Sequence, residues 1–594
     1  MFSDLNEKQK EAVEYGQGPL LIVAGAGSGK TKTLTSRLAY LIAVKKVNPE
    51  KVLAITFTNK AADEMKERVR RAIEKENIKI SKEPFVGTFH SFGARILRKE
   101  SRSLGRSISF SIFDDADSLS LIKKILKNLN ISTSNHAPAS LVREFSRIKS
   151  ELLDEKSFLG NKKSESVWYL FKEYEQVLEK NNAFDFDDLI EKPVRLFKKN
   201  REILKKYQSQ YDYVLVDEYQ DINTAQYLLV KLLASSHNNI NVVGDDQQAI
   251  YGFRFSDFRN FLNFEKDWPK TKLVFLEQNY RSTKNIIESS SALIARNLMQ
   301  KPKNLWTENE EGTRIRIVEH DDEFSEADFI VQNTQAYLKK GMNVGILFRT
   351  NAQSRALEQL FLEYGIKYNL FGALTFYERK EIKDIVAGLR YSLNSADEIS
   401  LSRLEKNFYK KTYLNLKDEL PKKSKMKPVQ IITYFIKATG YAELLKKNYE
   451  NYLERLENVQ ELSYFSEQFE DLSHFIEKVS LAHPLDDQKR KRNKKYLDGA
   501  NLMTIHLAKG LEFDVVFVTG VNEGILPHQR SLFLAEDVEE ERRLMYVAMT
   551  RAKKELYLNF YHVPSRFLSE LPSNYLEFSG DKALDDEERY IEYD

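Results

Sequence analysis

Short runs of apolar residues alternate along the chain with longer segments in which apolar residues recur at helical spacing. The first such group predicts buried strands at residues 19–24, 52–57, 213–216 and 240–243, and helices at residues 31–43 and 60–74. The pattern returns later, with strands expected at residues 314–318, 344–348, 501–505, 514–519 and 555–559. Strands that alternate with helices favour parallel sheets covered by helices on both faces. We therefore expect an α/β fold with two such domains.

Two long stretches, residues 92–185 and 393–497, contain few strand signals and abundant helical periodicity. We interpret them as mostly helical insertions, one in each α/β domain. The first α/β domain is then expected at residues 1–91 and 186–276, and the second at residues 277–392 and 498–575. Residues 581–594 contain seven Asp or Glu residues against one Lys and one Arg, so residues 576–594 are expected to form a disordered acidic tail.

A glycine-rich segment joins the first predicted strand to the helix that follows it. Glycines allow backbone N–H groups to surround a phosphate, and the helix N-terminus adds a favourable dipole. Lys30 would reach the β- and γ-phosphates of a nucleotide, and the Thr31 hydroxyl would bind Mg²⁺. An ordinary glycine turn is the alternative, which the strand-to-helix context disfavours. The phosphate-binding residues expected are Ala24, Gly25, Ala26, Gly27, Ser28, Gly29, Lys30 and Thr31.

A buried strand at residues 213–216 ends in two carboxylates, Asp217 and Glu218. Asp217 would hold Mg²⁺, and Glu218 would orient or deprotonate the attacking water. Together with the glycine-rich segment they indicate a nucleoside triphosphatase that uses water rather than a kinase. Phosphoryl transfer also needs positive charge opposite the γ-phosphate. Arg281 and Arg551 are candidates, although each taken alone is one of many arginines.

Composition excludes several other kinds of chemistry. The chain lacks cysteine, so disulfides, thiol catalysis and Cys-ligated metals are ruled out, and the nine histidines show no metal-ligand spacing. Neither a signal peptide nor an apolar run long enough to cross a membrane is present, which predicts a cytoplasmic protein without a membrane partner. Lys and Arg number 91 against 88 Asp and Glu, a balance that excludes a polycation but not a local basic groove for nucleic acid.

One segment departs from this balance. Residues 489–495 (KRKRNKK) contain six basic residues in seven. A solvated linker is one interpretation, and binding to a phosphate backbone is the other. If the run binds nucleic acid, neutralising it should flatten the dependence of affinity on salt by nearly one unit of log–log slope for each phosphate that the protein no longer neutralises.

Beyond the phosphate-binding segment, a series of motifs resembles the UvrD/PcrA/Rep-type superfamily 1 DNA helicases over about residues 1–575. This resemblance implies two RecA-like P-loop motor domains, each with a helical insertion, and one ATP between them. The motifs that carry it are residues 5–9 (LNEKQ), 56–62 (TFTNKAA), 87–91 (GTFHS), 185–189 (DFDDL), 244–254 (GDDQQAIYGFR), 277–282 (EQNYRS), 503–513 (MTIHLAKGLEF) and 541–551 (ERRLMYVAMTR).

The resemblance also assigns roles around ATP. Gln9 would read the adenine edge and Tyr280 would stack on the adenine. Gln248 would sense the γ-phosphate, and Arg281 and Arg551 would be arginine fingers from the second motor domain. The remaining contacts, to phosphate and ribose, are expected from Gly510 and Glu512.

A single DNA strand would follow an aromatic track, because stacking on a base contributes about 1–3 kcal/mol without reading its sequence. Any one of these aromatic residues, taken alone, is more often part of a core. The residues at matching family positions are Phe57, Phe186, Tyr251, Phe253 and Phe567, with polar contacts expected from Thr88, His90, Arg254 and His506.

The second insertion departs from the family pattern. It is shorter than in large family members and carries residues 403–411 (RLEKNFYKK) where relatives have a Gly-Ile-Gly turn near the duplex. The leading hypothesis is an ATP-dependent helicase acting on single-stranded DNA and single-strand/duplex junctions, as a monomer in isolation, with oligomerisation on DNA left open. The alternative is a translocase that displaces proteins from single strands with little unwinding. A nucleotide-gated scaffold with little turnover is a third hypothesis, disfavoured by the complete set of catalytic residues.

Overall fold

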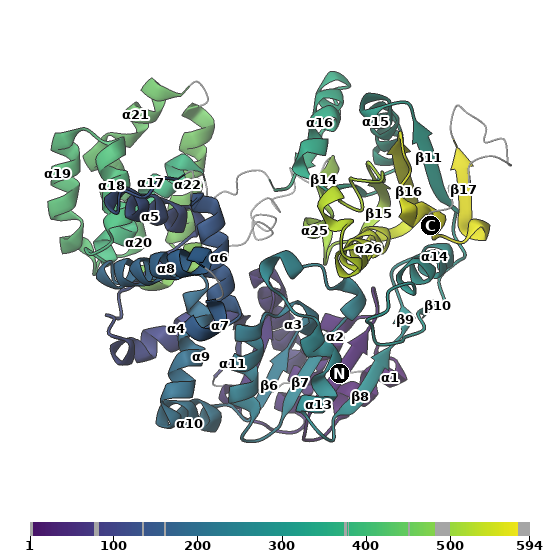
Figure 1. The fold of residues 1–594 in the computed structure, drawn as a ribbon, viewed down its shortest axis with the longest axis horizontal. Coiled ribbons are helices and arrows are strands. Elements are labelled where there is room, and N and C mark those ends of the chain that lie inside the picture. Colours follow the sequence, from purple (N-terminus) through teal and green to yellow (C-terminus); the bar gives the residue numbers. More distant parts are fainter. Residues whose placement is uncertain are drawn as a thin grey trace.

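The computed structural model describes residues 4–75, 82–133, 136–159, 162–372, 377, 379–449, 452–480 and 499–579. It contains two parallel sheets, each covered by helices, and two helical insertions (Figure 1). The insertions lie together on one side of the molecule, with the first α/β domain below and the second α/β domain opposite. The basic run at residues 489–495 lies outside the described residues.

The first sheet has six parallel strands in the order β3-β2-β6-β7-β1-β8. Alternate residues of its strands face opposite helical layers: Leu20 and Ile22 of β1 pack with α2 and α3, whereas Leu21 and Val23 pack with α4, α9 and α11. This explains the continuous apolar runs in the sequence, since both faces of the sheet are covered. The strands are β1 Leu20–Ala24, β2 Val52–Thr56, β3 Phe85–Thr88, β6 Tyr213–Val216, β7 Ile240–Gly244 and β8 Lys272–Leu276; the main helices are α1 Glu7–Glu14, α2 Lys30–Ala43, α3 Asn59–Lys75, α4 Phe89–Glu100, α9 Asp188–Lys199, α10 Arg201–Gln210 and α11 Thr224–Ala234.

The second sheet has seven parallel strands in the order β13-β14-β12-β15-β16-β11-β17. One face packs on α14 and α26, and the other on α15 and α16. The strands are β11 Ile315–His320, β12 Val344–Phe348, β13 Tyr368–Leu370, β14 Ala500–Thr504, β15 Phe513–Val518, β16 Ala552–Tyr561 and β17 Leu576–Ser579; the helices are α14 Lys284–Ile294, α15 Glu323–Lys339, α16 Ser354–Glu363, α25 Ile505–Ala508, α26 Ala535–Met549 and α27 Arg566–Ser569. A short pair, β9 Gln278–Asn279 with β10 Trp306–Thr307, lies between the two sheets in the chain order.

The insertions are helical, as the sequence predicts, but their edges differ from the expected ones. Phe92 and Ile96 of α4 belong to the core of the first α/β domain, so that insertion begins after α4. Ile382 and Ile385 of α17 pack inside the second insertion, which therefore begins before residue 393. The first insertion comprises β4 Ser111–Phe113, α5 Asp115–Asn128, α6 Pro138–Ser150, α7 Glu155–Phe158, α8 Lys162–Lys180 and β5 Ala183–Asp185; the second comprises α17 Lys380–Leu393, α18 Glu398–Asn407, α19 Lys410–Glu419, α20 Pro428–Thr439, α21 Tyr441–Asn448, α22 Tyr452–Ser466 and α23 Leu472–Ser480.

The expectation that the acidic tail starts at residue 576 is wrong. Residues 576–579 form β17, an edge strand that pairs in parallel with β11. The strand is short and three of its four residues are exposed, so its sequence lacks the continuous apolar run that marks the inner strands. None of the described helices is long and apolar enough to cross a membrane.

The two insertions contact each other through buried polar side chains. Arg390 of α17 forms ion pairs with Asp397 of its own insertion and with Asp117 of the first. Asp397 also accepts a hydrogen bond of 2.8 Å from the Ser111 hydroxyl. The Asn394 amide donates to the Asn181 carbonyl at 2.9 Å. A buried charge is costly without a partner, so these ion pairs fix the position of one insertion relative to the other.

Candidate active site and nucleic-acid interface

The glycine-rich segment lies where β1 ends and α2 begins, as expected. Gly27 has a φ of 66° and Gly29 a φ of 83°, a backbone region that side chains disfavour. Gly29 precedes the first helical residue, Lys30, so the free N–H groups of the first turn of α2 lie beside this turn. The segment therefore has the shape required to surround a phosphate at a helix N-terminus.

The two carboxylates after β6 lie directly beside this segment. The Thr31 hydroxyl donates to Asp217 Oδ2 at 3.1 Å, which places the two expected Mg²⁺ ligands together. Lys30 Nζ is 3.9 Å from Glu218 Oε2 and 3.9 Å from Asp245 Oδ2. Burial and the Glu218 carboxylate raise the pKa of Asp217 to about 7. Burial alone would raise the pKa of Glu218, but the positive charges of Lys30 and Lys509 outweigh it and lower that pKa.

These residues fit a magnesium ion that a nucleotide brings with it. Within the described ranges, no group of three or more His, Cys, Asp or Glu side chains could hold a metal by itself. Thr31 and Asp217 would supply two oxygen ligands. Mg²⁺ suits such an incomplete set, because it usually keeps several waters and is bound together with substrate phosphates.

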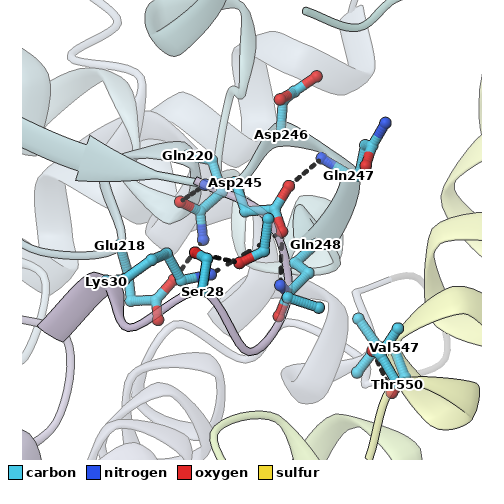
Figure 2. Close-up of polar contacts among 12 residues, drawn as sticks. Ser28, Lys30, Glu218, Gln220, Asp245, Asp246, Gln247, Gln248, Val547 and Thr550 are labelled. Carbon is cyan, nitrogen blue, oxygen red and sulfur yellow. Dashed lines mark hydrogen bonds and ion pairs between the residues drawn. The ribbon is translucent and has the colours of Figure 1, made fainter. Parts of the chain in front are cut away.

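Asp245, the residue directly after β7, connects the phosphate-binding segment to Gln248 (Figure 2). Its backbone N–H donates to Gln220 Oε1 at 2.9 Å, and its Oδ2 accepts from Gln248 Nε2 at 2.5 Å. Gln220 in turn donates to Glu218 Oε2 at 2.7 Å. The expected catalytic carboxylate and the expected phosphate sensor therefore belong to one hydrogen-bonded chain.

The second α/β domain supplies two arginines to the same place. Arg551, at the end of α26, donates from Nη2 to Gln248 Oε1 at 3.3 Å across the domain boundary. Burial and the neighbouring Arg281 lower the pKa of Arg551 to about 9. Arg281 pairs with Glu512 at 2.9 Å, and Lys553 pairs with the other oxygen of Glu512 at 2.8 Å.

A cleft of about 1570 Å³ separates the two domains at this point, lined by Lys30, Asp217, Glu218, Gln248, Arg281 and Arg551 among other residues. Tyr280 and Gly510 also line it, and Tyr280 is about half exposed. The Gln9 amide is already engaged within the chain: Nε2 donates to the Ser28 carbonyl at 3.0 Å and Oε1 accepts from the Asn6 N–H at 3.1 Å. Its role toward adenine stays a prediction.

Aromatic side chains from both domains form a continuous series near this cleft. Phe57 of the first domain stacks on Tyr251 with ring centroids 5.0 Å apart, and Tyr251 lies 5.9 Å from Phe253. Phe253, 51% exposed, meets the edge of His506 from the second domain at 5.2 Å. A second pair, His90 with Phe186, lies on the first domain at 5.6 Å. The Arg254 guanidinium lies 5.7 Å from the Phe253 ring.

Two residues expected on the DNA track lie elsewhere. Phe567 has no exposed surface and packs in the core of the second domain, with the Arg542 guanidinium 5.3 Å from its ring. It therefore presents no face on which a base could stack. Thr88 is buried, and its hydroxyl accepts from the Ser91 N–H at 3.2 Å as the N-cap of α4. Its role in this structure is to begin the helix that carries His90.

Sequence reasoning did not single out several residues of the site. Asp245 and Lys509 stand inside recognised motifs, where their charge was a usable signal. Lys509 Nζ reaches from the second domain to the Gln248 carbonyl at 2.6 Å and to Asp221 Oδ2 at 2.5 Å. Gln220 and Lys303 have no local pattern that could have marked them.

The site is typical of a two-domain P-loop nucleoside triphosphatase. It combines a glycine-rich phosphate segment and paired carboxylates at a strand end with arginines from a second RecA-like domain. Comparison with known proteins then narrows the class. Residues 5–269 match the UvrD/REP helicase N-terminal domain, and residues 274–452 and 439–562 match the UvrD-like helicase C-terminal domain. The chain belongs to the UvrD-like family of ATP-dependent DNA helicases.

Individual relatives support this assignment over nearly the full length. The chain is 40% identical to ATP-dependent DNA helicase PcrA of Bacillus subtilis (strain 168), covering 98% of this chain and 87% of the relative. It is 39% identical to the protein of the same name from Staphylococcus aureus (strain Mu50), covering 97% and 87%. For the Staphylococcus epidermidis protein of that name the identity is 38%, with the same coverage.

Proposed function

We propose that this helicase hydrolyses ATP in the cleft between its two α/β domains and uses the cycle to move along single-stranded DNA. The observation that carries the proposal is the contact of Arg551 with Gln248, because it joins the two domains at the expected γ-phosphate position. Lys30 and the backbone around Gly27 and Gly29 would hold the phosphates. Thr31 and Asp217 would hold Mg²⁺, which neutralises phosphate charge when bound.

The remaining catalytic groups have separate tasks. Glu218, whose pKa is lowered by Lys30 and Lys509, stays ionised and can accept a proton from the attacking water. Arg281 and Arg551 would face the charge that develops on the transferred phosphoryl group. Because these two side chains belong to the second domain, the site is complete only when the domains are close together. ATP binding and release would therefore change the distance between the domains.

The aromatic series would hold the DNA strand during this cycle. Phe57, Tyr251 and Phe253 lie on the first domain and His506 on the second, so a change in domain distance would act directly on the bound strand. Stacking accepts every base, which suits a motor that must pass through any sequence. On the family resemblance we propose 3′→5′ movement and a cytoplasmic role in DNA repair or replication restart.

ATP-driven unwinding of duplexes with a 3′ or a 5′ single-stranded tail tests activity and direction together. We expect unwinding of the 3′-tailed duplex alone, and loss of DNA-stimulated ATP hydrolysis in Lys30→Ala and Glu218→Gln. Wild-type hydrolysis rates in Lys30→Ala would refute the site. Preferential unwinding of the 5′-tailed duplex would refute the direction.

A translocase with little unwinding is a second candidate, favoured by the second insertion. Residues 403–411, which stand in place of the turn found in relatives, form the end of α18 and the start of α19. Arg403 pairs with Asp384 at 2.8 Å, and Phe408 is buried in the core of the insertion. This segment therefore joins two helices through residues 408–409, without the Gly-Ile-Gly turn of relatives. Displacement of a protein from single-stranded DNA without strand separation would support this candidate.

A further inference from the structure

Lys303 is a buried cation beside the nucleotide site that belongs to none of the recognised motifs. Its ammonium lies 2.5 Å from Asp245 Oδ1 and 2.8 Å from Asp246 Oδ1, and all three side chains are fully buried. Burial would lower the pKa of Lys303, but the two carboxylates outweigh it and raise that pKa, so the side chain is charged. A buried ammonium needs carboxylate partners, and its ion pairs in turn fix the positions of those carboxylates.

The segment that carries Lys303 is fixed against the first domain at several points. The segment lies between α14 and β10 in the sequence, so it belongs to the second α/β domain. The Lys301 N–H donates to Asp246 Oδ2 at 2.8 Å, and Gln247 Nε2 donates to Gln300 Oε1 at 2.7 Å. Leu305 packs against Ala26 of the phosphate-binding segment.

Leu305 approaches the phosphate-binding segment very closely. A Cβ atom at Gly25 would lie 2.0 Å from Leu305 Cδ2, so a larger residue there would have to displace the Leu305 side chain. Residues 300–305 thus form a strap along the phosphate-binding segment and the turn after β7. The strap has one charged side chain that reaches Asp245, namely Lys303.

Asp245 divides its two oxygens between different partners. Oδ1 contacts Lys303, whereas Oδ2 accepts from Gln248 Nε2 at 2.5 Å and lies 3.9 Å from Lys30 Nζ. Gln248 Oε1 is thereby left to face Arg551. The orientation of the Gln248 amide therefore depends on where the Asp245 carboxylate is held.

We propose that Lys303 is a positioning residue for ATP hydrolysis, which acts by holding Asp245. With Lys303 present, Asp245 is neutralised from the Oδ1 side, fixes the Gln248 amide and leaves Lys30 free to bind phosphate. Without it, Asp245 would be a buried carboxylate whose nearest remaining cation is Lys30, and would draw that ammonium away from the nucleotide. The inference rests on the proposed function, since it concerns the same site.

The proposal predicts a specific kinetic change. In Lys303→Met, KM for ATP should rise, because Lys30 is shared with Asp245, and kcat should fall, because the Gln248 amide is free to rotate. Residues that orient metal ligands contribute about 10- to 100-fold to activity, and by analogy we expect a combined loss in kcat/KM of that size. Lys303→Arg keeps the charge and should recover most of the activity.

The experiment measures DNA-stimulated ATP hydrolysis at varied ATP, together with thermal unfolding. Lys301→Gln is the matched control, because it removes a cation from the same strap whose ammonium pairs with Glu265 and not with Asp245. If Lys303→Met unfolds because it leaves two buried carboxylates unpaired, Lys303→Met/Asp246→Asn removes one of those charges and should show the same kinetic loss. The double variant Lys303→Met/Gln248→Ala tests whether Lys303 acts through Gln248. Its loss in kcat should be no larger than that of Gln248→Ala alone.

Two results would overturn the inference. One is a folded Lys303→Met, or its Asp246→Asn pair, with kcat and KM within about twofold of wild type, well below the expected loss. The other is a loss in kcat that multiplies fully with that of Gln248→Ala. Failure of the proposed function is distinct from both, because wild-type protein would then show no DNA-stimulated hydrolysis.

Discussion

Replacement of Arg551 by methionine separates catalysis from folding. The side chain is buried, with Nε donating to the Val547 carbonyl at 2.9 Å and Nη1 donating to the Leu511 carbonyl at 3.2 Å. These two bonds fix the guanidinium so that Nη2 faces Gln248. An arginine that stabilises the phosphoryl-transfer transition state contributes about 10³–10⁵ in rate. That range is about 4–7 kcal/mol of activation free energy.

Arg281 remains in the variant, so we expect Arg551→Met to lose about 10³ in kcat, at the lower end of that range. The change in Tm should be small. The lowered pKa of Arg551 means that the folded structure disfavours its charge, and relief of this cost offsets the removal of four hydrogen bonds of about 1 kcal/mol each. Arg551→Lys should recover little, because one ammonium does not reproduce the planar fork that donates all four hydrogen bonds.

The assay is steady-state ATP hydrolysis at saturating single-stranded DNA, with Tm measured on the same samples. Arg314→Met, at an exposed position of the second domain, is the matched control. A kcat within about tenfold of wild type in a folded Arg551→Met protein would refute the reasoning, because a transition-state arginine contributes more than this. A change confined to KM would also refute it, because it would make Arg551 a ground-state contact.

Three further predictions concern the pH dependence of stability and two aromatic residues. Burial raises the pKa of Glu326 to about 8, so the folded protein favours the protonated form and its stability should fall as pH rises from about 4.5 to 8. Glu326→Gln keeps the oxygen that accepts from the Gly520 N–H. This variant should therefore raise Tm at pH 8 and leave it unchanged near pH 4.5. A Tm gain that is equal at both pH values would contradict this. Phe253→Ala should weaken single-strand binding by about 1–3 kcal/mol at unchanged Tm. Phe567→Ala should instead destabilise the second domain by about 3–5 kcal/mol. Loss of DNA binding at unchanged Tm in this variant would show that Phe567 contacts the DNA strand.

Much of the fold could be predicted because both sheets are covered on two faces. Buried parallel strands such as β1 and β6 are continuous apolar runs, and the phosphate-binding segment and the Asp217–Glu218 pair follow two of them directly. The edge strand β17 escaped prediction because three of its four residues are exposed, so they do not stand out from the acidic stretch that follows.

The site was predicted only where local sequence carries the chemistry. Gln248 and Arg551 lie 303 positions apart and were expected together only through the family resemblance. The pairing of Lys303 with Asp245 spans 58 positions, and nothing around Lys303 distinguishes it from the other lysines of the chain. Phe567 shows the opposite error: it was expected on the DNA track from a matching family position, but an aromatic ring fits a core as well as a surface, and here it is packed in the core.

The contact between the insertions closes the molecule into a ring of four bodies. The first insertion interrupts the first domain, the second interrupts the second domain, Arg390 joins the insertions, and Lys303, Lys509 and Arg551 join the domains. The second insertion also contacts the first domain directly, since Glu477 of α23 lies 3.9 Å from Arg98 of α4. While these contacts are intact, the change in domain distance proposed for the ATP cycle would also have to change the angle between the two insertions.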